Sequence, residues 1–261
     1  MKQDMRDIQD LPDYRKVDID KVGVKDINYP IVVLDKKNKT QHTIATINMY
    51  VDLPHRFKGT HMSRFIEILN EHRREITIRK IPVILEKMKE RLKANSAHLE
   101  VDFPYFIERE APVSKAKSLM EYRCKYSGTI TDKKDFVMEV KVPVTTLCPC
   151  SKEISERGAH NQRGLVVVSL RTRKFLWIED LIELIEECAS SPVYALLKRS
   201  DERFVTEMAY NHPMFVEDVV RDIALKLGKK EEVTWFSVEA ENCESIHNHS
   251  AYAYLESKGT D

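Results

Sequence analysis

Glycine is scarce in this sequence, with seven in 261 residues, while charged residues make up 32% of the chain. So little glycine leaves few places for flexible linkers, and so many charged side chains indicate an ordered, well-solvated surface. No short-period repeat or low-complexity segment interrupts the chain. The length suits one large domain or two similar halves.

Long apolar runs are absent too, since no stretch approaches the roughly 18 apolar residues that a membrane-spanning helix needs. The five cysteines are odd in number and irregularly spaced, and the opening MKQDMRDIQD is charged rather than apolar. A disulfide framework, a secretory signal peptide and a membrane partner are therefore not expected. We expect a cytoplasmic protein with reduced thiols.

Neither sign of charge is in excess. Lysine plus arginine and aspartate plus glutamate each number 42, which gives a formal net charge of zero at pH 7. A protein that binds nucleic acid through a general basic surface needs a surplus of positive charge, so a nucleic-acid partner is not expected. A small molecule is the more natural partner.

What the sequence does contain is one order of strand and helix patterns that occurs twice. The run Gln41–Leu53 alternates, for example, and places Ala45, Ile47, Met49 and Val51 on one side. The expected strands are 29–34, 41–53, 97–108, 118–131, 135–146, 165–173, 233–241 and 250–256, and the expected helices are 62–72, 78–94, 178–189 and 213–227. Strands joined by short turns pair antiparallel, so the sequence predicts an α+β fold of two tandem ββααββ units with helices on one face.

The same patterns set the expected domain boundaries. Residues 1–28 are polar and without periodicity, which predicts an N-terminal arm that is ordered only by packing on something else. A first unit is expected at 29–133 and a second unit at 134–261.

The stretch Thr145–Gly164 (TTLCPCSKEISERGAHNQRG) places Cys148-Pro149-Cys150 and His160 close together after a strand pattern. If the chain stays extended at Pro149, both sulfurs face one cleft, whereas a turn there parts them. The spacing fits neither a C-x-x-C redox motif nor a four-cysteine zinc site. An open metal site with one thiolate and His160 fits, with Cys148 as the first candidate and Cys150 as the second. The alternative is two buried thiols and a surface histidine.

A second polar group lies near the C-terminus, in ENCESIHNHSAYAYLES. Glu241, Glu244, His247 and His249 fall within nine residues between two strand patterns. Two imidazoles near two carboxylates suit proton transfer near neutral pH. The alternative is a solvated hairpin tip.

Two glutamates follow helix-start signals. Glu202 follows Ser200-Asp201, and Glu217 follows Pro213, so each can simply favour the helix dipole. A fixed carboxylate such as Glu217 can also accept two parallel N–H bonds, which matches the N1–H and 2-amino edge of guanine or a pterin.

The loop HRFKGTHMSR, at 55–64, is basic and leads into the helix pattern that begins at Met62. Backbone N–H groups at a helix start, together with Lys58 and Arg64, suit a phosphate group. The alternative is an ordinary helix start with solvated basic side chains.

With these residues in view, the sequence resembles the bacterial GTP cyclohydrolase IB family, whose enzymes open folate synthesis. The resemblance spans most of the chain, in the right order. The matching stretches are LPHRFKGTHMSRF, VPVTTLCPCSKEISERGAHNQRG, SDERFVTE, FVEDVVRD and ENCESIHNHSAYA. The resemblance implies the tunnelling fold, in which sheets join between subunits into barrels, and a homotetramer with active sites at the subunit interfaces.

The resemblance also implies the reaction of GTP and water to 7,8-dihydroneopterin triphosphate and formate. One divalent metal per active site is implied, Zn²⁺, Mn²⁺ or Fe²⁺, with Cys148, His160 and Glu202 as its ligands. Affinity order alone does not choose among these metals.

Further roles follow from the same resemblance. Glu217 corresponds to the glutamate that anchors the base, and basic groups such as Lys58 and Arg64 of a neighbouring subunit hold the triphosphate. The catalytic residues are then Cys148 together with Glu244, His247 and His249, of which the last three fall in the acid–base and substrate region.

Two other functions compete with this interpretation. The segment KSLMEY at 117–122 resembles the signature of the nitrile reductases of queuosine synthesis, which share the fold and use a catalytic cysteine and NADPH. Such a reductase needs no His160 partner for its cysteine and leaves the Glu202 region unexplained. The other competitor is a non-catalytic binding module in which a metal only stabilises the loop.

Overall fold

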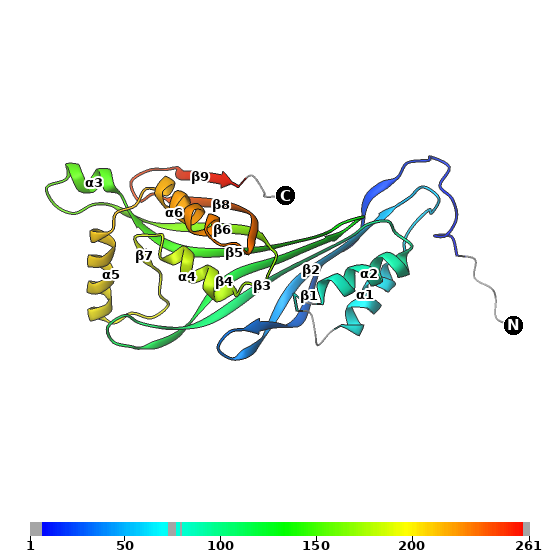
Figure 1. Cartoon of the computed structure of the whole chain (residues 1–261), viewed down its shortest axis with the longest axis horizontal. Coiled ribbons are helices and arrows are strands. Elements are labelled where there is room, and N and C mark those ends of the chain that lie inside the picture. The colour runs from blue at the N-terminus through cyan, green and yellow to red at the C-terminus, as the bar shows by residue number, and fades with distance from the viewer. Residues whose placement is uncertain (1–6, 73–76, 79, 258–261) are drawn as a thin grey trace. The chain divides into compact units, whose positions relative to one another are not determined.

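The computed structural model describes residues 7–72, 77–78 and 80–257 (Figure 1). Residues 1–6 of the expected arm, 73–76 and 79 of the first expected unit, and 258–261 of the second lie outside the described residues. Within the described ranges, no helix is both long enough and apolar enough to cross a membrane.

The first half of the chain has the expected order of strand, strand, helix, helix, strand, strand. Its elements are β1 (Ile19–Asp35), β2 (Lys39–Leu53), α1 (Met62–Glu71), α2 (Ile81–Leu92), β3 (Ala97–Glu110) and β4 (Lys117–Ile130). In β2 the alternation is as expected, because Ala45, Ile47, Met49 and Val51 are each at most 1% exposed. These side chains form the core of the first half together with the buried faces of α1 and α2.

The strand β1 begins at Ile19, inside the expected arm. Its register with β2 shifts twice, between Ile19 and Val22 and between Val24 and Ile27, so the side chains do not alternate regularly there. At Gly23 the two strands approach so closely that a Cβ atom would lie 1.9 Å from the Met49 carbonyl oxygen. These irregularities explain why the sequence pattern did not reveal this part of the strand.

The second half repeats the order with three insertions. Its repeated elements are β5 (Lys134–Leu147), β6 (Asn161–Thr172), α4 (Ile178–Glu186), α6 (Val216–Gly228), β8 (Val233–Cys243) and β9 (Ser250–Glu256). The inserted elements are α3 (Pro149–Ile154), β7 (Ser191–Pro192) and α5 (Arg199–Asn211). In this half α6 packs on β8, β9 and α4 through a continuous buried face. The predicted α+β class is confirmed.

Within the described part of the chain, the strands follow one another in the order β1-β2-β3-β4-β5-β6-β8-β9, and β7 pairs with β5. The pairs β1–β2, β2–β3, β5–β6, β6–β8 and β8–β9 are antiparallel. Neighbours in sequence are thus mostly neighbours in space, as short connections require.

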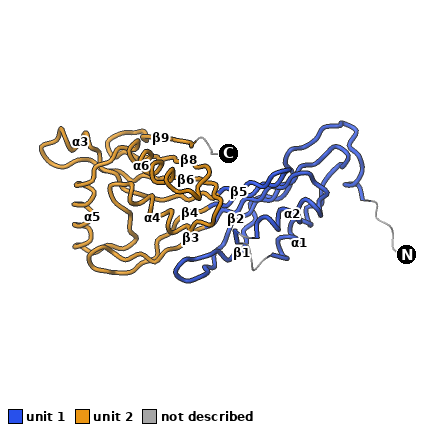
Figure 2. Tube along the Cα trace, in the orientation of Figure 1, with its two compact units in different colours: residues 1–103, 125–137 blue, residues 104–124, 138–261 orange. Residues whose placement is uncertain are grey.

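The chain divides into two compact units (Figure 2). One contains the described residues up to Phe103 together with Lys125–Val137, and the other contains Pro104–Cys124 together with the described residues from Met138. The long strands β3, β4 and β5 each contribute residues to both units. This division follows packing rather than sequence repetition, so the tandem boundaries expected at 28/29 and 133/134 stay a prediction.

The start of α5 is anchored by Asp201, whose side chain is fully buried. Its carboxylate accepts four hydrogen bonds, from the N–H groups of Val113, Ser114 and Lys198 and from the Ser114 hydroxyl, at 2.6–2.8 Å. Burial raises the pKa of a carboxyl, but here the donated hydrogen bonds outweigh it and hold the pKa of Asp201 well below its ordinary value of 3.8. The ionised carboxylate therefore ties α5 to the β3–β4 connection.

We expect this anchor to be sensitive to acid. Because the folded-state pKa of Asp201 is depressed, its stabilisation is fully present above the unfolded value near 3.8 and is lost as the pH falls through the folded value. Asp201→Asn should therefore lower the melting temperature most near pH 7, with the gap to the parent shrinking below about pH 4. Thermal denaturation from pH 3 to 7 measures this, and a gap independent of pH would contradict it.

A second buried network joins α4 to the strands of the same unit. Glu186 is 5% exposed, accepts a hydrogen bond of 2.7 Å from the Tyr122 hydroxyl and forms an ion pair with Arg109. Tyr122 is fully buried, and burial raises the pKa of its hydroxyl, which therefore stays a donor.

Glu186→Ala should lower the free energy of unfolding by about 3 kcal/mol. The substitution leaves the Arg109 guanidinium and the Tyr122 hydroxyl without their shared partner in a poorly solvated place. The neighbouring Glu187 offers a matched control, because its ion pair with Lys226 is exposed and Glu187→Ala should cost less than about 1 kcal/mol. Urea denaturation measures the free energy of unfolding of both variants. Equal losses would contradict the larger contribution expected from the buried contacts of Glu186.

Candidate active site

The β5–β6 hairpin brings Cys148 and His160 together. Leu147, the last residue of β5, pairs with Asn161, the first residue of β6. One position further out, the N–H of Cys148 donates a hydrogen bond of 3.1 Å to the carbonyl of His160. The ladder thus continues past the strand ends, and Cys148 and His160 face each other at what we call the hairpin mouth.

The helix α3 begins directly after Cys148. Pro149 occupies its first turn, where a missing N–H costs nothing, and Cys148 is the N-cap. The Cys148 Sγ accepts a hydrogen bond of 3.3 Å from the N–H of Ser151. Because the chain turns at Pro149, the extended arrangement with both sulfurs in one cleft is not adopted. Cys148 is half-buried, whereas Cys150 is exposed.

His160 is held both through its backbone and through its ring. Its N–H donates to the Ser151 hydroxyl at 3.3 Å, and its Nδ1 lies 3.2 Å from Oε1 of Gln162, a buried side chain on β6. Sequence reasoning passed over Ser151 and Gln162. The available signal was a polar residue at an inward position of a strand, since Gln162 stands opposite the buried Thr146.

The turn between β8 and β9 lies at the same end of the sheet as the hairpin mouth. Arg163 of β6 pairs with Cys243 of β8, and Cys243 pairs with Ser250 of β9. Since these strands are antiparallel, residues 244–249 connect β8 to β9 next to the start of β6. Beneath this turn, a Cβ atom on Gly164 would lie 2.4 Å from Oδ1 of Asn242, so only glycine leaves room there.

Within this turn the predicted acid–base residues meet. The rings of His247 and His249 stack with centroids 4.9 Å apart, and both side chains are exposed. The carboxylate of Glu244 lies 3.6 Å from Nε2 of His247. A histidine beside a carboxylate can hold and release a proton near neutral pH.

The first turn of α6 reaches the same end of the sheet. The N–H of Met214 donates a hydrogen bond of 3.0 Å to the carbonyl of Leu147, the last residue of β5. Asp218 caps the helix by accepting from the N–H of Phe215 at 3.1 Å. Glu217 is therefore not needed as a cap. It is exposed, and its carboxylate has no partner among the described residues.

Glu202 is exposed in the first turn of α5. The other end of this helix contacts the hairpin loop, where Lys152 Nζ donates to the carbonyl of Tyr210 at 2.6 Å. Glu202 lies about 12 Å earlier along the helix axis, at roughly 1.5 Å per residue. Within the described chain, Cys148, His160 and Glu202 do not form a group of three close ligand atoms. Glu202 as a ligand stays a prediction.

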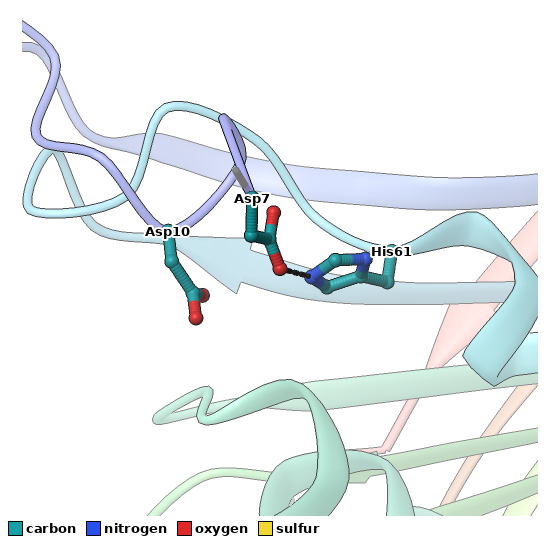
Figure 3. A group of neighbouring side chains, drawn as sticks. All are labelled: Asp7, Asp10 and His61. Carbon is teal, nitrogen blue, oxygen red and sulfur yellow. Dashed lines mark ion pairs between the residues drawn. The ribbon is translucent and has the colours of Figure 1, made fainter. Parts of the chain in front are cut away.

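The three ligand-type side chains that do come within 4.8 Å of one another in the described ranges are Asp7, Asp10 and His61 (Figure 3). They lie in the other unit, where Asp7 also accepts a hydrogen bond of 3.0 Å from the N–H of Gln9. Asp7 forms an ion pair with His61 at 3.0 Å, and Asp10 forms one with Lys93 at 3.4 Å. The first ion pair joins the N-terminal segment to the residue before α1, and the second joins it to the residue after α2.

Lys58 and Arg64 also lie in this other unit. Lys58 lines a cavity of about 290 Å³ together with Asp13, Arg15 and Phe57. The Arg15 guanidinium is paired with Asp13 at 2.7 Å. Arg64 Nη1 donates to the carbonyl of Arg91 at 3.0 Å, near the end of α2. The triphosphate roles of Lys58 and Arg64 stay predictions.

The architecture is an α+β antiparallel-sheet fold that resembles urate oxidase. A urate oxidase mutant from Bacillus sp. TB-90 matches with a TM-score of 0.56 at 7% identity, over 92% of this chain and 99% of the other. Uricase from Arthrobacter globiformis matches with a TM-score of 0.53 at 7% identity, over 93% and 95%. At such low identity the likeness concerns the fold alone, and it confirms the predicted fold.

The sequence relatives are far closer. A family model described as type I GTP cyclohydrolase FolE2 matches residues 5–253. The GTP cyclohydrolase FolE2 of Syntrophotalea carbinolica is 67% identical over 97% of this chain and 95% of its own length. That of Pelobacter propionicus is 62% identical over 97% and 98%. The chain belongs to the type I GTP cyclohydrolase FolE2 family and is a GTP cyclohydrolase, as its sequence motifs predict.

Proposed function

We propose that this enzyme is metal-dependent and converts GTP and water to 7,8-dihydroneopterin triphosphate and formate, the first step of tetrahydrofolate biosynthesis. The observation that carries the proposal is the gathering of three chemical groups at one end of one sheet. These groups are Cys148 with His160 at the hairpin mouth, the free carboxylate of Glu217, and the turn that contains His247. They come from segments far apart in the chain.

The hairpin mouth fits a divalent metal. Cys148 offers a half-buried sulfur, and His160 uses Nδ1 toward Gln162, so its other ring nitrogen is left to bind. Cys148, His160 and Glu202 would hold one Zn²⁺, Mn²⁺ or Fe²⁺ per active site. When bound, such a metal supplies a Lewis acid that lowers the pKa of a water molecule to about 7.

Glu217 would bind the guanine edge. It is exposed in the first turn of α6, and the cap of that helix is supplied by Asp218 instead. An unpaired carboxylate can accept both the N1–H and the 2-amino group of guanine, and the start of the helix favours its negative charge.

The turn 244–249 would move the protons. Opening the imidazole ring of a purine and closing a pterin ring require several proton transfers, which exposed imidazoles can perform near neutral pH. Glu244 lies within ion-pair distance of His247, so a carboxylate and an imidazole stand side by side in this turn. His249 stacks on His247 and is the second candidate for the same task.

We propose that the enzyme is a cytoplasmic homotetramer with active sites at subunit interfaces. Lys58 and Arg64 of a neighbouring subunit would then bind the triphosphate. Large apolar side chains near the site support an interface, because Phe204, Phe215 and Ile246 are 46%, 39% and 63% exposed. The outer edges of β1 and β9, which pair with no further strand of the described residues, would pair between subunits and close the barrels.

The direct test is turnover of GTP by the metal-loaded protein. The reaction should release formate and yield a product that becomes fluorescent, as pterins do, after oxidation. Metal-free protein should show neither, and adding Zn²⁺, Mn²⁺ or Fe²⁺ back should restore both. NADPH-dependent reduction of a nitrile without GTP turnover would favour the reductase alternative. Bound metal with no turnover of any purine nucleotide would favour a binding module.

A further inference from the structure

Gln162 is a polar side chain in a buried position of the hairpin mouth. It is 6% exposed, stands opposite Thr146 across the β5–β6 ladder, and its Oε1 lies 3.2 Å from Nδ1 of His160. A carbonyl oxygen can only accept a hydrogen bond, so this contact suits the tautomer of His160 in which Nδ1 carries the proton and Nε2 has the lone pair.

We propose that Gln162 is a positioning residue that selects the Nδ1–H tautomer of His160 and directs Nε2 toward the metal. The inference rests on the proposed metal-dependent function and extends it to a residue outside the ligand set. Histidine ligands are generally fixed in this way by a second group that accepts from the non-ligating nitrogen. A neutral amide serves this purpose without changing the charge of the site.

The backbone contacts of His160 show why the side chain needs such a partner. Its N–H donates to the Ser151 hydroxyl, and its carbonyl accepts from the N–H of Cys148. These two bonds fix the Cα position relative to the Cys148 sulfur but leave the side-chain torsions free. The contact with Gln162 removes that freedom, so the direction of Nε2 depends on it.

Two substitutions separate positioning from packing. Gln162→Leu keeps a side chain of similar size but removes the acceptor, and Zn²⁺ affinity should fall roughly 10- to 100-fold. Gln162→Glu restores an acceptor for Nδ1–H and should recover most of the affinity. Thr146→Val is the matched control, because Thr146 is fully buried opposite Gln162 and its Oγ1 has no hydrogen-bond partner in the described structure. This control should bind Zn²⁺ like the parent.

The experiment measures Zn²⁺ dissociation constants of the full chain by competition with a chromophoric chelator. In parallel, ¹⁵N NMR of the metal-free protein reports which ring nitrogen of His160 carries the proton, with His160→Asn assigning the signal. The parent should show the Nδ1–H form, and Gln162→Leu should shift it toward Nε2–H or a mixture.

Unchanged Zn²⁺ affinity and an unchanged tautomer in Gln162→Leu would overturn the inference. So would an equal loss of affinity in Thr146→Val, because that would indicate a general packing defect. If the parent itself bound none of Zn²⁺, Mn²⁺ and Fe²⁺, the proposed metal dependence would fail instead. The tautomer comparison would then decide alone whether Gln162 positions His160.

Discussion

Replacing Cys148 with alanine is expected to lower kcat/KM for GTP on the order of 10³-fold or more and to remove most of the bound metal. A metal-supplied Lewis acid contributes several kcal/mol of transition-state stabilisation, and each 1.36 kcal/mol is worth about a factor of ten. The fold should survive, because the half-buried sulfur makes one hydrogen bond, to the N–H of Ser151. GTP turnover measures the loss of activity, metal content measures the loss of metal, and circular dichroism measures whether the fold survives.

Cys150 provides the control for this experiment. It lies two residues away in α3 and is exposed, so Cys150→Ala should keep both metal and turnover. If Cys150→Ala lost the metal while Cys148→Ala kept it, the two cysteines would exchange roles. Normal turnover and metal content in Cys148→Ala would exclude Cys148 as a ligand.

The second large effect concerns recognition of the base by Glu217. GTP should be preferred over ITP, which lacks the 2-amino group, and over ATP, whose edge is mismatched. Leaving one contact of a carboxylate unmade costs on the order of 1–3 kcal/mol, so discrimination should reach roughly tenfold to a hundredfold per lost contact. Glu217→Gln should weaken GTP turnover and leave metal content intact. Steady-state kinetics with the three nucleotides measure this.

Asp222 supplies a matched control, since it is an exposed carboxylate about one and a half turns further along the same helix. Asp222→Asn makes the same change of charge and should leave the preference for GTP unaltered. Equal efficiency of the parent on GTP and ITP would show that Glu217 does not bind the guanine edge. Loss of metal in Glu217→Gln would place it in the metal site instead.

Much of the fold is predictable from the sequence because the core faces are periodic. The alternation in β2 and the helical spacing in α6 predict most of the buried side chains, although Phe215, the residue before α6, fits the apolar spacing and is 39% exposed. Prediction weakens where periodicity is broken. The first part of β1 contains two register shifts, and α5 buries only Asp201 and Ala209, so it has no apolar stripe to detect.

The candidate site was predictable as a set of residue types and motifs. Cysteine, histidine and glutamate have chemistry that can be recognised without coordinates, and the motif CPCSKEISERGAHNQRG carries much of the resemblance to the family. The roles of the supporting residues Ser151 and Gln162 were not predictable, because a polar residue at an inward strand position indicates that it has a partner but not which residue that partner is. Gln162 gains its meaning from the 3.2 Å contact with His160.

The amino-acid pattern is sufficient for the α+β class, the family and the candidate chemistry of this protein, since each depends on local periodicity or on short motifs. Three-dimensional packing is what joins Cys148 to His160, brings the start of α6 to the end of β5 and places the β8–β9 turn beside them. It also separates Cys148 from Cys150 by starting a helix at Pro149. The physical reason is that strand register and helix docking are set by contacts between segments far apart in the chain, and no local pattern contains those contacts.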